Sequence, residues 1–230
     1  IYTWSPNSFI SDININDPFV NPNSNIKYFV NGTDLNGCSN IDSIEIAVDA
    51  LPNIDLSNDT SICIGDTINI SASGGNQYLW LNPSSISNTN IANPDVWPGS
   101  SSIYNVIVTG TNLCKDTGEI NITVNPLPTV FAGNDQNICF GDSAQLNASG
   151  NATSYFWNNG VNDGVKFQVS NTQDYILTAT DANSCSNTDT VTVSSLIVPN
   201  TFVGETDGYI NLCVNDSVRL QGQGADIYRC

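Results

Sequence analysis

The sequence predicts an all-β protein built from small β-sandwiches in tandem, and three observations lead to this fold class. A segment recurs along the chain, because Trp4, Trp80 and Trp157 lie 76 and 77 residues apart. The polar residues are mainly Asn, Ser, Thr and Asp, which favour turns and strand surfaces over helices, while charged residues make up only 12%. Apolar residues alternate with polar ones in short runs, as in strands with one buried face, and no helical period is found.

Each repeat begins with a cysteine and a glycine-containing turn, and then reaches a tyrosine and a tryptophan. The copies are Cys63-Ile64-Gly65-Asp66-Thr67 with Tyr78-Leu79-Trp80, and Cys139-Phe140-Gly141-Asp142-Ser143 with Tyr155-Phe156-Trp157. A further copy runs from Cys213-Val214-Asn215-Asp216-Ser217 to Tyr228-Arg229-Cys230, where Cys230 replaces the tryptophan as a true substitution or an uncertain assignment. This period is too long for a solenoid unit and predicts repeats that fold individually.

Leu-Pro pairs separate the repeats and define four predicted segments. Residues 1–51 are the back part of a repeat, 52–127 and 128–199 are complete repeats, and 200–230 are the front part of another. The two ends of the sequence fall at equivalent points of the repeat. We therefore expect a fragment of a longer array, or chains that complete one another end to end, with Cys213 of one copy reaching Cys38 of the next.

The predicted strands assign each complete repeat to a sandwich of immunoglobulin type, with about seven short strands separated by turns. They are expected near 67–71, 77–81, 103–109 and 118–124, and near 144–148, 154–158, 174–180 and 189–194. Trp4, Trp80 and Trp157 stand one strand after the first inward-facing strand, so we predict that they anchor the cores. Stacking on sugars is the alternative role for these side chains.

The charge balance excludes several classes of partner and reaction. The chain has a net charge of −17, five Lys and Arg residues, and no His. Nucleic acid and anionic membranes, which need clustered cations, are not expected partners. Triads that require His are excluded, and Asp66, Asp142 and Asp216 recur beside a turn, which predicts turn hydrogen bonds. We expect a protein that is not an enzyme, and no apolar run is long enough for a membrane-spanning helix.

The cysteines occupy fixed places in the repeat and predict disulfides formed in an oxidising compartment. A late cysteine follows a tyrosine by ten residues at Cys38, Cys114 and Cys185. The favoured pairing is within repeats, Cys63–Cys114 and Cys139–Cys185, each stabilising its repeat by about 4 kcal/mol. Cys38 and Cys213 would then find partners outside the sequence or in a neighbouring copy.

Two alternatives stay open for Cys63: it lies further along the first strand than assumed, or the pairing crosses repeats, for example as Cys63–Cys185. In an immunoglobulin-type sandwich the first turn and the last hairpin lie at opposite ends, whereas a disulfide needs Cα atoms within about 7 Å. Pairing of Cys63 with Cys185 avoids that conflict.

These motifs resemble the immunoglobulin-like and PKD-like repeats of very large surface proteins of Bacteroidota, among them gliding-motility adhesins and other type IX secretion cargo. The resemblance rests on the Cys63–Thr67 and Tyr78–Trp80 motifs, on Tyr104–Thr109, and on the Asp34-Leu35-Asn36-Gly37-Cys38 turn. One departure is Gly110-Thr111-Asn112-Leu113, which replaces that turn in the second repeat. The resemblance implies an extracellular or cell-surface location, and O-glycans at Ser43, Thr67, Ser143, Thr190 and Ser217.

Oxygen-rich turns at Asp34, Asp135 and Asp181 are the weak candidates for bound calcium, with ordinary Asx-turns as the alternative. No other cofactor is expected. The predicted function is a structural and adhesive repeat segment of an exported bacterial surface protein or extracellular filament, acting as a disulfide-stabilised stalk. Its expected partners are neighbouring repeats or copies of itself in a fibre, with surface polysaccharide as a further candidate. The alternative function is a set of accessory, glycan-binding modules of a secreted hydrolase.

Overall fold

A computed structural model describes residues 1–81, 84–197, 202–203, 214, 217 and 222–223 of the chain. In these residues every regular element is a β-strand, so the predicted all-β class is confirmed. The chain divides into two compact units, Ile1–Val124 and Asn125–Cys230. This division falls three residues before the predicted boundary between 127 and 128, and the four-segment division itself stays a prediction.

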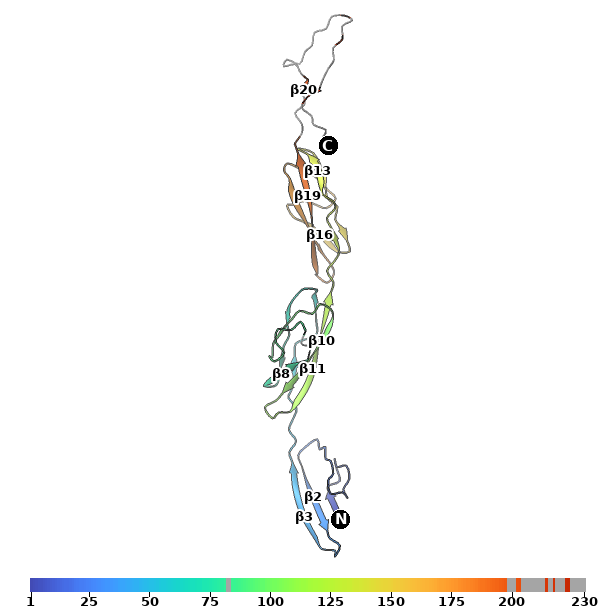
Figure 1. Cartoon of the computed structure of the whole chain (residues 1–230), viewed down its shortest axis with the longest axis vertical. Coiled ribbons are helices and arrows are strands. Elements are labelled where there is room, and N and C mark those ends of the chain that lie inside the picture. The colour runs from blue at the N-terminus through green and yellow to red at the C-terminus, as the bar shows by residue number, and fades with distance from the viewer. Residues whose placement is uncertain (82–83, 198–201, 204–213, 215–216, 218–221, 224–230) are drawn as a thin grey trace. The chain divides into compact units, whose positions relative to one another are not determined.

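Residues 1–51 form one antiparallel sheet with the order β1-β2-β3 (Figure 1). Its strands are β1 (Tyr2–Ser5), β2 (Ile26–Thr33) and β3 (Ser39–Ile46). The alternation of Ile44, Glu45 and Ile46 places the two isoleucines on the same face of β3. A single hairpin, which begins after Thr33, joins β2 to β3.

The second repeat is a sandwich whose larger sheet has the strand order β5-β11-β10-β8. Figure 1 labels β8, β10 and β11 of this sheet. The larger sheet consists of β5 (Thr60–Cys63), β8 (Gln77–Trp80), β10 (Ser102–Thr109) and β11 (Lys115–Asn125). Two short pairs form the other layer, namely β4 (Asp55–Leu56) with β7 (Ala72–Ser73), and β6 (Ile68–Asn69) with β9 (Asp95–Val96). Apolar side chains of both layers meet in one core around Trp80, Val106 and Ile120.

The third repeat has the same topology, with the larger sheet ordered β13-β19-β18-β16. Its strands are β12 (Val130–Phe131), β13 (Gln136–Cys139), β14 (Ser143–Gln145), β15 (Ser149–Gly150), β16 (Ser154–Trp157), β17 (Lys166–Gln168), β18 (Gln173–Thr180) and β19 (Ser186–Leu196). Its separate core surrounds Trp157, Leu177 and Val191. A last antiparallel pair, β20 (Phe202–Val203) with β21 (Gly222–Gln223), lies within the predicted segment 200–230. The two complete repeats are immunoglobulin-like sandwiches.

The three repeating tryptophans differ in burial. Trp80 and Trp157 are 1% and 2% exposed and lie at the centres of the two cores. Their indole N–H groups are satisfied by the Ile91 carbonyl at 2.9 Å and by Asp163 Oδ1 at 3.0 Å. Trp4 donates to the Ile15 carbonyl at 2.8 Å but is only half-buried, which departs from the prediction of a core side chain.

The reason for this difference is that residues 1–51, all of which the structure describes, form one sheet without an opposing one. Ile44 of β3 is 53% exposed, whereas Ile120, its equivalent in the second repeat, is 0% exposed. Tyr28 is nonetheless buried, because the loop before β2 covers it and its hydroxyl donates to the Ser8 carbonyl at 2.8 Å. The β1-β2-β3 sheet therefore presents an apolar face that a complete repeat would bury.

Candidate functional site

The residues that stood out in the sequence gather at the two ends of each repeat. One end carries the Cys-x-Gly-Asp turn and is called the Gly-Asp end below. The other end carries the turn between the last two strands and is called the hairpin end.

The Cys-x-Gly-Asp motif is a tight turn in both complete repeats. The Asp66 N–H donates to the Cys63 carbonyl at 3.0 Å, and the Asp142 N–H donates to the Cys139 carbonyl at 2.9 Å. Gly65 and Gly141 have φ angles of +94° and +87°, in the region that glycine adopts without steric cost. Asp66 Oδ2 also accepts from the Cys63 N–H at 3.3 Å, so this acid serves the turn as predicted from its recurrence.

The hairpin end has one geometry in all three copies. The first residue of the loop donates its N–H to the carbonyl of the cysteine at 2.9 Å, in the pairs Asp34–Cys38, Gly110–Cys114 and Asp181–Cys185. The residue before the cysteine has a positive φ, which is +85° at Gly37, +67° at Leu113 and +66° at Ser184. The altered sequence of the second repeat therefore keeps the same turn and places a leucine in a conformation that suits glycine.

Substitution of Leu113 by glycine, the residue of the first repeat, should stabilise the second repeat by about 1 kcal/mol. The leucine side chain is 74% exposed, so its removal loses little packing. Urea denaturation of the wild-type and L113G proteins measures the difference. G37L is the reciprocal control in the first repeat, and an L113G protein that is less stable than wild type would contradict the explanation.

The acids that were candidates for calcium accept hydrogen bonds from the backbone. Asp34 Oδ1 accepts from the N–H groups of Asn36 and Cys38, both at 2.8 Å. Asp181 Oδ1 accepts in the same way from Asn183 and Cys185, both at 2.9 Å. Asp135 Oδ1 accepts from the Thr192 N–H at 2.8 Å. The described part of the chain contains no group of three or more His, Cys, Asp or Glu side chains that could hold a metal ion.

The cysteines correct the favoured disulfide pairing. Cys38 and Cys114 are free, whereas Cys63, Cys139 and Cys185 are disulfide-bonded. Since Cys114 is free, the predicted Cys63–Cys114 bond is wrong. Cys213 and Cys230 lie outside the residues that the structure describes.

The predicted Cys139–Cys185 bond is also wrong, for a geometric reason. Strand β13 runs parallel to β19 with Cys139 opposite Leu196, while Cys185 precedes the first residue of β19. Eleven residues of extended strand separate Leu196 from Cys185, which is about 36 Å. A disulfide needs Cα atoms within about 7 Å, so the two ends of one repeat cannot be joined in this way.

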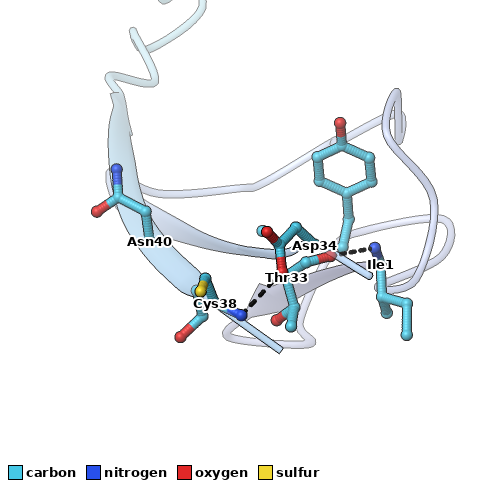
Figure 2. Close-up of a pocket in the computed structure, with 8 residues that line it drawn as sticks. Ile1, Thr33, Asp34, Cys38 and Asn40 are labelled. Carbon is cyan, nitrogen blue, oxygen red and sulfur yellow. Dashed lines mark hydrogen bonds between the residues drawn. The ribbon is translucent and has the colours of Figure 1, made fainter. Parts of the chain in front are cut away.

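Two open hollows lie at hairpin ends. Figure 2 shows one of about 430 Å³, in which the Ile1 ammonium donates to the Thr33 carbonyl at 2.8 Å and the Cys38 N–H donates to Asp34. It is lined by Ile1, Tyr2, Gly32, Thr33, Asp34, Cys38, Ser39 and Asn40. A similar hollow in the second repeat is walled on one side by Ala50, Leu51 and Pro52 of the preceding linker. The residues that line the second hollow include no Asp, Glu, Lys, Arg or Cys.

Two asparagine side chains form hydrogen bonds between a repeat and the linker that precedes it. Asn112 Nδ2, at the hairpin end of the second repeat, donates to the Ala50 carbonyl at 2.9 Å. In the third repeat, Asn187 Nδ2 donates to the Pro128 carbonyl at 3.0 Å. Sequence reasoning missed both residues, because asparagine is abundant throughout the chain and nothing in its spacing marked these two. Each linker is thus hydrogen-bonded to the repeat that it enters.

The remaining candidate residues are on the surface or in the cores. Ser43, Thr67, Ser143, Thr190 and Ser217, the proposed O-glycosylation sites, are all exposed. Burial raises the pKa of the Tyr104 and Tyr175 hydroxyls, so both stay protonated at neutral pH. Within the part of the chain that the structure describes, no helix is long and apolar enough to cross a membrane.

No protein-family model matches the sequence, and no curated protein matches it either. Among solved structures, a three-domain immunoglobulin segment of titin is similar at 12% identity and a TM-score of 0.39, covering 85% of this chain and 88% of that one. Extracellular domains 3–5 of Drosophila OTK are similar at 9% identity and a TM-score of 0.33, covering 74% and 70%. Immunoglobulin domains 1–4 of Sidekick-1 are similar at 12% identity and a TM-score of 0.31, covering 85% and 67%. At these identities and TM-scores, the similarity to solved structures supports no conclusion about function. Conclusions about function therefore depend on the residues of this chain.

Proposed function

We propose that this chain is a structural and adhesive segment of an exported bacterial surface protein or extracellular filament, in which successive sandwiches form a stalk. The observation that carries the proposal is the pair of closed, separate cores. Each of these two repeats is preceded by a short linker, and an asparagine side chain of the repeat donates a hydrogen bond to a backbone carbonyl of that linker. Repeats of this kind serve as spacers, because each repeat keeps its own fold and the number of repeats determines the length of the stalk.

The cysteines and the charge support an extracellular location. Disulfide-bonded cysteines persist in oxidising compartments and are rare in the cytosol. The net charge of −17 favours solubility and repulsion between neighbouring stalks. Within this proposal, O-glycans at the five exposed Ser and Thr residues would enlarge and protect the surface, and intact-mass measurement of the native protein tests for them. The finer assignment to gliding-motility adhesins of Bacteroidota remains part of the proposal.

A stalk is tested by the size of the chain in solution. A compact globule of this length would have a radius of gyration of about 17 Å. For a stalk we expect small-angle X-ray scattering to give about twice that value, with the scattering profile of an elongated particle. Electron microscopy of native surface material should show filaments with a repeating bead. A radius near 17 Å for the oxidised monomer would overturn the stalk proposal.

A further inference from the structure

We propose that Asn36, at the hairpin end of the first repeat, is a site of spontaneous modification, where the side-chain amide is lost as ammonia and a carboxylate takes its place. The reaction is deamidation, its co-reactant is water, and its products are aspartate and isoaspartate at position 36. The proposal goes beyond the stalk function and does not depend on it, because it concerns the chemistry of one turn.

The reaction needs an asparagine whose following backbone nitrogen can approach its own side chain. The Gly37 nitrogen attacks the carboxamide carbon of Asn36, forms a new carbon–nitrogen bond, and expels the amide nitrogen as ammonia together with the Gly37 proton. Water then opens the five-membered succinimide. Opening at the side-chain carbonyl gives aspartate, and opening at the backbone carbonyl gives isoaspartate. A following glycine favours the attack, because it has no Cβ and its backbone rotates freely.

The fold protects one of the Asn-Gly pairs in the sequence. The pairs are Asn31-Gly32, Asn36-Gly37 and Asn159-Gly160. Asn31 lies in the central strand β2, where it pairs with Thr3 of β1 on one side and with Ile41 of β3 on the other. The Gly32 nitrogen can reach the Asn31 carboxamide only if the backbone rotates out of both ladders, which breaks their hydrogen bonds. We therefore expect Asn31 to be stable in the folded chain.

The pair Asn36-Gly37 has no such protection, because both residues are exposed in the loop between β2 and β3. The Gly37 N–H donates to the Asp34 carbonyl at 3.3 Å, and the Asn36 amide donates to Asp34 Oδ2 at 3.5 Å. Both distances exceed those of ordinary hydrogen bonds, so little holds the two reacting groups in place. The pair Asn159-Gly160 is also exposed, and we expect it to react as well.

The hairpin turn of the third repeat provides a comparison inside the same chain. Asp181 Oδ1 accepts from the N–H groups of Asn183 and Cys185, just as Asp34 Oδ1 accepts in the first repeat. Asn183 is exposed and takes the place of Asn36, but the residue that follows it is a serine. Ser184 has a φ angle of +66°, close to the +85° of Gly37, so the turn accommodates either residue. Asn183 should therefore react more slowly than Asn36 for a chemical reason alone.

Incubation of the full chain at neutral pH, followed by tandem mass spectrometry of its peptides, tests the proposal. Asn36 should gain a carboxylate severalfold faster than Asn31 and Asn183. Incubation of the same chain in urea is the matched control, because unfolding removes the ladders of β2 and should raise the rate at Asn31 to that at Asn36. Equal rates at Asn31 and Asn36 in the folded chain, or no conversion at Asn36, would overturn the proposal.

Reciprocal variants separate the effect of glycine from the effect of the turn. G37S should slow the reaction at Asn36 severalfold, and S184G should accelerate it at Asn183 by a similar factor. Each variant should leave the rate in the other turn unchanged. If G37S fails to fold, S184G and the wild-type comparison still decide the question. An S184G chain in which Asn183 stays as slow as in wild type would contradict the proposal.

Discussion

Replacement of Trp80 by alanine should destabilise the second repeat by about 3–5 kcal/mol, a large part of the stability of a domain of this size. Trp80 is 1% exposed at the centre of its core, and its loss leaves a cavity that the surrounding strands cannot close. It also leaves the Ile91 carbonyl without the indole donor. Hydrogen exchange measured by mass spectrometry should show lost protection in residues 52–124.

The third repeat should keep its protection in the W80A protein, because its core around Trp157 shares no residue with the core around Trp80. Trp97 is a matched control in the same repeat, since it is 45% exposed and lies outside that core. We expect W97A to change stability by less than about 1 kcal/mol. Equal losses in W80A and W97A, or loss of protection throughout the chain, would contradict the model of independent repeats.

Fusion of residues 200–226 to the N-terminus of residues 1–51 should produce one complete repeat that folds by itself. The two segments are cut at equivalent points of the repeat, and together they hold 78 residues, close to the observed spacing of 76 and 77. The front segment supplies apolar alternation at Val218 and Leu220, as Ala144 and Leu146 do in the core of the third repeat. It would cover the apolar face of the β1-β2-β3 sheet, on which Ile44 is 53% exposed.

The fused protein should unfold cooperatively, and the fluorescence of Trp4 should shift to shorter wavelength as the indole becomes buried. Residues 128–199 by themselves are the positive control, because their core is complete. Residues 1–51 by themselves, and a fusion carrying V218D and L220D, are the negative controls and should lack a cooperative transition. A fusion that behaves like these negative controls would show that the repeat boundaries are wrong.

The expected bond between Cys213 of one copy and Cys38 of the next stays a prediction, because Cys213 lies outside the residues that the structure describes. Cys213 corresponds to Cys139, and Cys38 corresponds to Cys185. In the third repeat these positions lie at opposite ends, about 36 Å apart along β19. By this equivalence we expect no bond between Cys213 and Cys38 within a repeat that two copies complete.

The sequence alone determined the all-β class, the repeat and most strand positions. Alternation at Ile120, Ile122 and Val124 predicted a strand near 118–124, and β11 spans Lys115–Asn125. The turn function of Asp66 was also predictable, because a residue that returns with every copy of a fold serves that fold. These features depend on local pattern and spacing, which a sequence displays directly.

Only the tertiary structure decided the cysteines, the linkers and the exposure of Trp4. Whether two cysteines can pair depends on which strand ends lie side by side. In the third repeat the parallel register of β13 with β19 places Cys139 beside the end of β19, and no sequence motif indicates this register. The contacts of Asn112 and Asn187 join residues about 60 apart in sequence, in a chain where asparagine is common. Burial of Trp4 depends on an opposing sheet, so the same motif gives a core residue in one repeat and a half-exposed one in another. The local pattern of apolar, polar and glycine residues specifies strands and turns. The distances between strand ends depend on how the strands pair in the sheets, so only the tertiary structure determines them.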